Sequence, residues 1–170
     1  MTAKGTAGPL RRIVVSGLAA LSMLLLAAPG AAADIVLTLS VDREARITAL
    51  DAAGAGVTDG TFSLADADEV RAHGAVHDEF VSVDDELGPK IVRAVETYTL
   101  DDGSSFTIRS VGRRTSSDGA TLTLSTTVVL MDGTGAYAGL TAQGVGTTVV
   151  DLTSRTVHSR YDLDMRADAA

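Results

Sequence analysis

The sequence predicts an all-β protein, an antiparallel up-and-down β-barrel of about eight strands that follows an N-terminal signal peptide. Apolar and polar residues alternate with a period of two through most of the chain after residue 33, which is typical of strands with one buried face. Asp-Gly pairs at residues 102–103, 118–119 and 132–133 favour hairpin turns. A sandwich would satisfy the same pattern, but a closed barrel leaves no exposed edge strand, so we favour the barrel.

The first 33 residues are typical of a secretory signal peptide. Lys4, Arg11 and Arg12 precede an apolar run over residues 13–28, and the small residues 31–33 follow it, so we expect cleavage near Ala33. A membrane span needs about 20 apolar residues, which makes a retained anchor the less favoured alternative. We therefore expect a secreted, extracellular protein.

Residues 34–170 are expected to form a single domain. The chain contains no cysteine, which excludes disulfides, thiolate metal sites and a cysteine nucleophile. Its formal net charge is −8. This excess of acidic residues disfavours binding to nucleic acid, and it disfavours an anionic membrane surface once the signal peptide is removed.

The first half of the domain shows strand patterns with one ambiguous segment. Residues 35–41 alternate, residues 46–50 begin a return strand, residues 51–60 form a loop and residues 61–64 form the next strand. Asp66 and Glu69 could form a helical capping box within residues 66–83. Gly74 and the β-branched residues nearby favour a strand instead.

The second half of the domain alternates more clearly. One face of the predicted strand 90–100 carries Val92, Ala94, Glu96, Tyr98 and Leu100. Further strands are expected after Gly103, with Phe106 and Ile108 on one side, along Leu122–Leu130, at 145–152 and at 155–166. In the last of these, Val157, Tyr161, Leu163 and Met165 alternate with charged residues and His158.

A glycine-rich stretch contains Gly133, Gly135, Tyr137 and Gly139. A phosphate-binding loop is one interpretation, but it requires a helix immediately after the loop, and here the strand pattern resumes. We favour a structural role, in which the glycines permit a tight turn and leave room for Tyr137.

The run Gly133–Leu140, followed by residues 144–146, resembles the signature of the allene oxide cyclase and dirigent-like barrel superfamily, in particular its small exported bacterial members. The resemblance implies an eight-stranded antiparallel barrel, often trimeric, with a cavity for hydrophobic small molecules. It also implies an isomerase or cyclase of lipid-like substrates as one activity. The pocket cysteine of the plant cyclase has no counterpart, since this chain contains none.

Glu96 is the candidate functional residue, because it shares a face with apolar side chains. A carboxylate on an interior face could serve as an acid, a base or a ligand anchor; alternatively, Arg109 or Arg160 could pair with it. We predict Glu96, Tyr98, Arg109 and Tyr161 as ligand-binding residues, and Glu96 also as the candidate catalytic residue.

No metal or cofactor is expected. His73 and His77 are four residues apart on a predicted strand, a separation of roughly 13 Å, which is too far for one ion.

The combined interpretation is an exported, soluble β-barrel that binds a small hydrophobic molecule without catalysis, or that serves as a structural module. The alternative is an isomerase or cyclase of the allene oxide cyclase type. A weaker alternative is a self-associating surface protein. A homo-oligomer, a trimer by the resemblance, is the expected protein partner.

Overall fold

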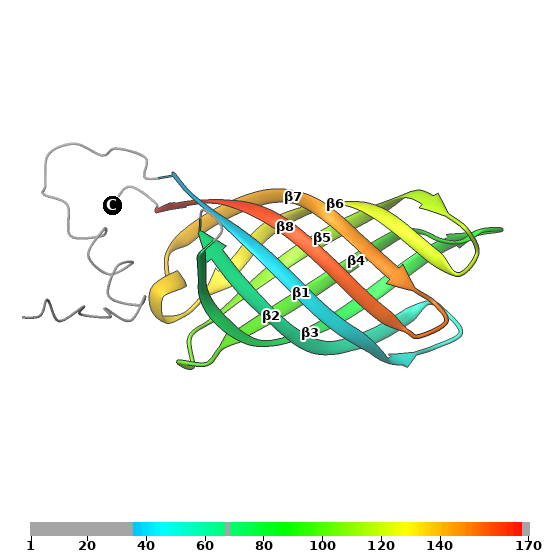
Figure 1. Ribbon diagram of the computed structural model, residues 1–170, viewed down its shortest axis with the longest axis horizontal. Coiled ribbons are helices and arrows are strands. Elements are labelled where there is room, and N and C mark those ends of the chain that lie inside the picture. The colour runs from blue at the N-terminus through cyan, green and yellow to red at the C-terminus, as the bar shows by residue number, and fades with distance from the viewer. Residues whose placement is uncertain (1–35, 67–68, 168–170) are drawn as a thin grey trace, which may run out of the picture.

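The computed structural model describes residues 36–66 and 69–167, and these form a closed antiparallel barrel (Figure 1). Each strand pairs with the next in sequence and β8 pairs with β1, which confirms the predicted up-and-down barrel. The elements are β1 (Val36–Leu50), β2 (Ala55–Asp66), β3 (Glu69–Asp85), β4 (Gly88–Leu100), β5 (Ser105–Ser117), β6 (Thr121–Gly133), the 3-10 turn η1 (Gly135–Tyr137), β7 (Leu140–Asp151) and β8 (Thr156–Ala167). The predicted signal peptide lies outside the described residues.

Within the described part of the chain, no helix is long and apolar enough to span a membrane.

Two predictions for the first half of the domain are wrong. Residues 46–50 do not begin a return strand but complete the 15-residue β1. Residues 51–60 are not one long loop, because β2 already begins at Ala55. A Cβ atom on Gly60 would lie 2.5 Å from the Cα of Ala45. Gly60 therefore allows β1 and β2 to approach each other closely, and it does not form a turn. The ambiguous segment 66–83 does contain a strand, β3.

The alternation in the second half of the domain is confirmed. In β4 the inner side chains are Ala94, Glu96, Tyr98 and Leu100, all buried. In β8 the four predicted apolar residues point inward, whereas His158, Arg160, Asp162, Asp164 and Arg166 are exposed. The barrel therefore has a largely apolar interior, and charged side chains line the outside of β8.

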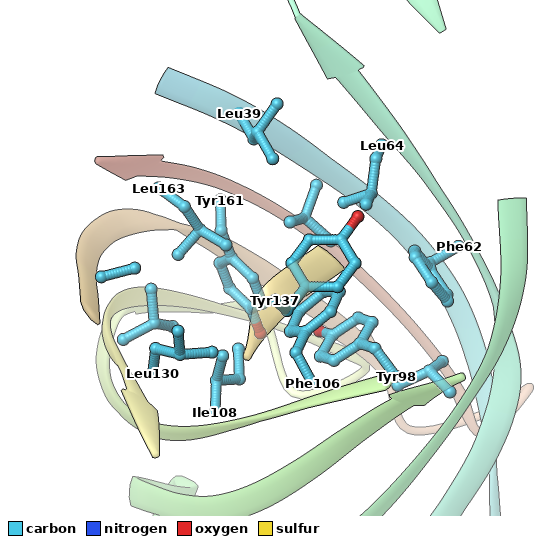
Figure 2. Close-up of a cluster of buried hydrophobic side chains, with 14 of the residues drawn as sticks. Leu39, Phe62, Leu64, Tyr98, Phe106, Ile108, Leu130, Tyr137, Tyr161 and Leu163 are labelled. Atoms are coloured by element: carbon cyan, nitrogen blue, oxygen red, sulfur yellow. The ribbon is translucent and has the colours of Figure 1, made fainter. Parts of the chain in front are cut away.

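One end of the barrel is filled with apolar side chains (Figure 2). We call it the closed half. Phe106 stacks on Tyr98 at a ring-centroid distance of 4.7 Å, Phe62 meets Tyr98 edge-on at 4.9 Å, and Tyr137 of η1 lies 5.0 Å from Phe106. Aliphatic side chains fill the remaining space, among them Leu39, Val41, Leu64, Ile108, Leu130 and Leu163.

The glycine-rich stretch forms the turn that places Tyr137 in the closed half. Gly135 has a positive φ of 58°, a conformation that favours glycine. A Cβ atom on Gly133 would lie 2.5 Å from the carbonyl oxygen of Tyr137. Thr134 fixes the turn to β5, because its hydroxyl accepts a hydrogen bond of 2.9 Å from the backbone N–H of Ser105. The strand β7 follows this turn directly.

Candidate functional site

The other end of the barrel contains a cavity of about 240 Å³. We call this end the open half. The turn at residues 51–54, the ends of the β3–β4 hairpin at Asp84 and Pro89, and Leu152 after β7 surround its mouth. These turns lie at the same end of the barrel (Figure 1). The walls are mainly apolar and include Ile47, Phe80, Val92, Ala94, Leu122, Leu124, Val150 and Val157.

A layer of buried polar side chains separates the two halves. Its side chains come from seven of the eight strands. They are those of Arg43, Thr58, Asp78, Glu96, Thr126, Thr148, Ser159 and Tyr161. We call these eight residues the polar layer. All but Ser159 also line the cavity, so the polar layer forms its floor.

Arg43 is the centre of the polar layer and is only 3 % exposed. Its Nη1 donates to Asp78 Oδ1 at 2.9 Å and to Glu96 Oε2 at 2.7 Å, while Nη2 lies 2.6 Å from Asp78 Oδ2. Burial alone would lower the pKa of Arg43, but the acidic groups around it, Glu96 foremost, outweigh this effect and raise the pKa. The guanidinium therefore stays charged and joins β1 to β3 and β4.

Glu96 accepts hydrogen bonds from two tyrosines as well as from Arg43. The hydroxyl of Tyr98 donates to Oε2 at 2.6 Å, and the hydroxyl of Tyr161 donates to Oε1 at 3.2 Å. Burial, together with the charge of Glu96, raises the pKa of both tyrosines. Both phenols are therefore neutral donors at neutral pH.

Asp78 is the second carboxylate of the polar layer. It accepts a hydrogen bond from the hydroxyl of Thr58 in addition to those from Arg43. Burial raises the pKa of Asp78, against the opposing effect of Arg43, and the charge of Glu96 raises it further. Two carboxylates thus share one guanidinium in the barrel interior.

Hydroxyl groups continue the polar layer around the barrel. Thr148 lies within hydrogen-bond distance of Thr126 at 3.1 Å, of Ser159 at 3.0 Å and of Tyr161 at 3.4 Å. Among the fully buried side-chain nitrogen and oxygen atoms of the described residues, only Arg43 Nε has no hydrogen-bond partner. A buried N–H without an acceptor is costly, so this atom marks an incomplete contact at the cavity floor.

The structure brings three of the four predicted ligand-binding residues together. Glu96, Tyr98 and Tyr161 are buried, and both tyrosines donate a hydrogen bond to Glu96, although only Glu96 and Tyr161 line the cavity. Arg109 does not belong to this group, because it is exposed on the outside of β5. Arg160 is also exposed, so the partner of Glu96 is Arg43 instead.

Sequence reasoning missed Arg43 and Asp78, although a signal for both was present. Arg43 alternates with the buried Val41 and Ala45, and Asp78 follows two residues after the buried Val76. A charged residue on an otherwise apolar face is the signal that identified Glu96, and it applies to these two residues equally.

The histidines of β3 lie on the outside of the barrel. His73 and His77 are exposed, and His77 Nδ1 lies 2.7 Å from Asp59 Oδ1 on β2. In the part of the chain that the structure describes, no group of three or more potential ligands could hold a metal ion.

Comparisons with known proteins do not identify a family. No family model matches the chain, and no curated protein matches it. One solved structure that it matches is a conserved protein of unknown function with a hot dog fold from Alicyclobacillus acidocaldarius, at 10 % sequence identity and a TM-score of 0.17. The match covers 91 % of this chain and 87 % of the other, and at this TM-score it supports no functional argument.

Proposed function

We propose that the barrel binds a small, mainly hydrophobic molecule in its open half and does not act on it chemically. The observation that carries the proposal is the cavity of about 240 Å³, with apolar walls, a polar floor and a mouth between three turns. Ligand sites in proteins share this design of apolar walls with a few polar groups that orient the ligand.

The hydrogen bonds of the polar layer favour binding over catalysis. Most acceptor positions of the two carboxylates are taken by protein donors: Arg43, Tyr98 and Tyr161 donate to Glu96, and Arg43 and Thr58 donate to Asp78. A general base needs to reach a substrate proton directly or through one water. These contacts instead hold five strands together and give the cavity a fixed floor.

The relationship to the allene oxide cyclase and dirigent-like barrels is part of the same proposal. Its support is the glycine-rich sequence at residues 133–140 together with the eight-stranded closed barrel. Such a relationship would also make a homo-oligomer, a trimer in particular, the expected assembly.

Two neighbouring residues of β4 provide the test. Ala94 lines the cavity, whereas Val95 points outward and is 46 % exposed. The neutral probe N-phenyl-1-naphthylamine fluoresces strongly in apolar surroundings, so its titration reports binding. We expect Ala94→Phe to abolish the fluorescence increase because the new ring occupies the cavity. Val95→Phe is the matched control and should bind as the wild type does.

An unchanged titration in Ala94→Phe would place the probe outside the cavity and contradict the proposal. Glu96→Gln separates binding from catalysis. We expect it to leave the affinity for this neutral probe largely unchanged. Turnover of a lipid-like epoxide that disappears in a folded Glu96→Gln variant would contradict the non-catalytic function and support a cyclase.

A further inference from the structure

The cavity is lined by more negative than positive side chains. Its charged residues are Arg43 and four carboxylates, those of Asp51, Asp78, Asp84 and Glu96. Asp51 and Asp84 lie at the mouth, and Asp78 and Glu96 at the floor. A cleft lined by one sign of charge, with apolar walls, concentrates the electric field and attracts ligands of the opposite sign. The lining therefore favours a cation over an anion.

The two carboxylates at the floor of the cavity contribute most to this preference for a cation. Asp78 and Glu96 are 2 % and 1 % exposed, and Arg43 is the cation that both contact. A buried charge without a counter-charge is costly. Burial, and to a lesser degree the charge of Glu96, raises the pKa of Asp78. A second positive charge at the floor would balance the second carboxylate.

The same two carboxylates can still accept hydrogen bonds. A carboxylate offers about four lone-pair positions. Asp78 Oδ1 accepts one hydrogen bond, from Arg43, and Glu96 Oε1 accepts one, from Tyr161 at the long distance of 3.2 Å. Each carboxylate thus has an oxygen with a free lone pair, and an ammonium group supplies three N–H donors.

We propose that the ligand is an amphiphilic amine, whose ammonium group binds Asp78 and Glu96 and whose hydrocarbon part lies along the apolar walls. This inference rests on the proposed function, since it assigns a chemical class to the molecule in the open half. The walls that would contact the hydrocarbon include Leu122, Leu124 and Val150.

The unpartnered Nε–H of Arg43 is an independent sign that the floor is incomplete. Arg43 lines the cavity, is almost fully buried, and leaves this donor without an acceptor. An anion in contact with it would be a third negative charge beside Asp78 and Glu96. A neutral oxygen, of water or of a hydroxyl group on the ligand, satisfies the donor without that cost.

The test compares three eight-carbon molecules that differ only in the polar end: octylamine, octanol and octanoate. Each molecule is titrated into the full-length protein loaded with N-phenyl-1-naphthylamine, and the loss of probe fluorescence measures displacement. The titrations are carried out at pH 7, where an alkylamine is protonated. We expect octylamine to displace the probe at a concentration about ten-fold or more below that of octanol, and octanoate to be the weakest. Ala94→Phe should remove displaceable probe altogether, which confines the signal to the cavity.

Three carboxylate variants locate the ammonium group. We expect Asp78→Asn and Glu96→Gln each to reduce the preference for octylamine over octanol about ten-fold, because each removes a charge from the floor. Asp84→Asn removes a charge at the mouth and should change the preference less than about two-fold, since exposed charges are screened. Retained octanol binding shows that each variant is folded.

Equal displacement by octylamine and octanol in the wild type would overturn this inference and leave the proposed function intact. An octylamine preference that persists in both floor variants would also overturn it. Absence of any probe binding to the wild type would instead contradict the proposed function itself.

Discussion

The closed and open halves of the barrel are built from the same eight strands, yet only one of them is filled. In the closed half, Phe62, Tyr98, Phe106 and Tyr137 form a continuous aromatic cluster. In the open half, smaller residues such as Ala94, Ser110 and Gly112 face the barrel axis and leave the cavity. The difference shows that the size of the inward side chains decides which part of a barrel is a packed core and which part has room for a ligand.

The polar layer marks the boundary between these two tasks. Arg43 and its two partners, Asp78 and Glu96, are buried between the aromatic cluster and the cavity. A buried ion pair is often no more stabilising than an apolar replacement of both partners, whereas loss of one partner is costly.

Arg43→Met should have the largest effect. It leaves Asp78 and Glu96 buried without a cation, so we expect a loss of about 3–5 kcal/mol in the free energy of unfolding. Urea denaturation measures the loss. Arg109→Met, at an exposed position on β5, is the control and should cost less than about 0.5 kcal/mol. Equal effects of the two substitutions would show that the polar layer does not hold the halves together.

A matched pair of leucines compares the halves directly. Leu163 is fully buried in the closed half, and Leu124 lines the cavity. We expect Leu163→Ala to cost about 3–5 kcal/mol and Leu124→Ala about 2–3 kcal/mol. The cost is smaller at Leu124 because the new space joins an existing cavity. Chemical denaturation under identical conditions gives both values, and the reverse order would contradict the division into halves.

A matched pair of alanines tests the same difference by adding volume. Ala142→Leu, which lies beside Met165 in the closed half, should cost about 1–3 kcal/mol because the buried side chains around it leave little space. Ala94→Leu, at the cavity wall, should change the stability by less than about 1 kcal/mol. Thermal unfolding followed by circular dichroism separates the two. A similar loss at both positions would mean that the open half has no usable space.

The smallest effect is expected at His77, which lies on the outer surface of the barrel and therefore in neither half. The hydrogen bond to Asp59 raises the pKa of His77 on the outside of β3. A raised pKa in the folded state means that the stabilisation is complete below the unfolded pKa of about 6.5 and disappears as the pH rises through the folded pKa. The advantage of the wild type over His77→Gln in melting temperature should therefore be larger at pH 5.5 than at pH 8.5.

Probe binding should not differ between the wild type and His77→Gln at either pH, because His77 lies on the outer surface. A change in binding would show that the outer wall and the cavity are coupled, which the comparison of the two halves does not predict.

The sequence allowed the barrel and the inner face of its later strands to be predicted, but only part of the site. In β8 the alternation of Val157, Tyr161 and Leu163 with charged residues assigns each side chain to a face. The glycines of β2 misled the prediction, since Gly60 serves strand proximity and not a turn. Alternation places Glu96 inside, but it does not reveal that Arg43, on a strand far away in sequence, is its partner. Such a contact depends on which strands face each other across the barrel.

The cavity could not be predicted from the alternation of apolar and polar residues either. It depends on the summed volumes of inward side chains from all strands at one level of the barrel, including Ala94, Gly112 and Thr126. No single strand carries that information.

The most direct test of the account is a methyl NMR titration of the protein with octylamine. Leu122 and Leu124 lie at the cavity walls, and Leu39 and Leu163 lie in the closed half. We predict saturable shifts of the Leu122 and Leu124 methyl signals, while those of Leu39 and Leu163 stay in place. Shifts spread evenly over all four residues, or confined to leucines outside the barrel such as Leu87, would contradict a binding site in the open half.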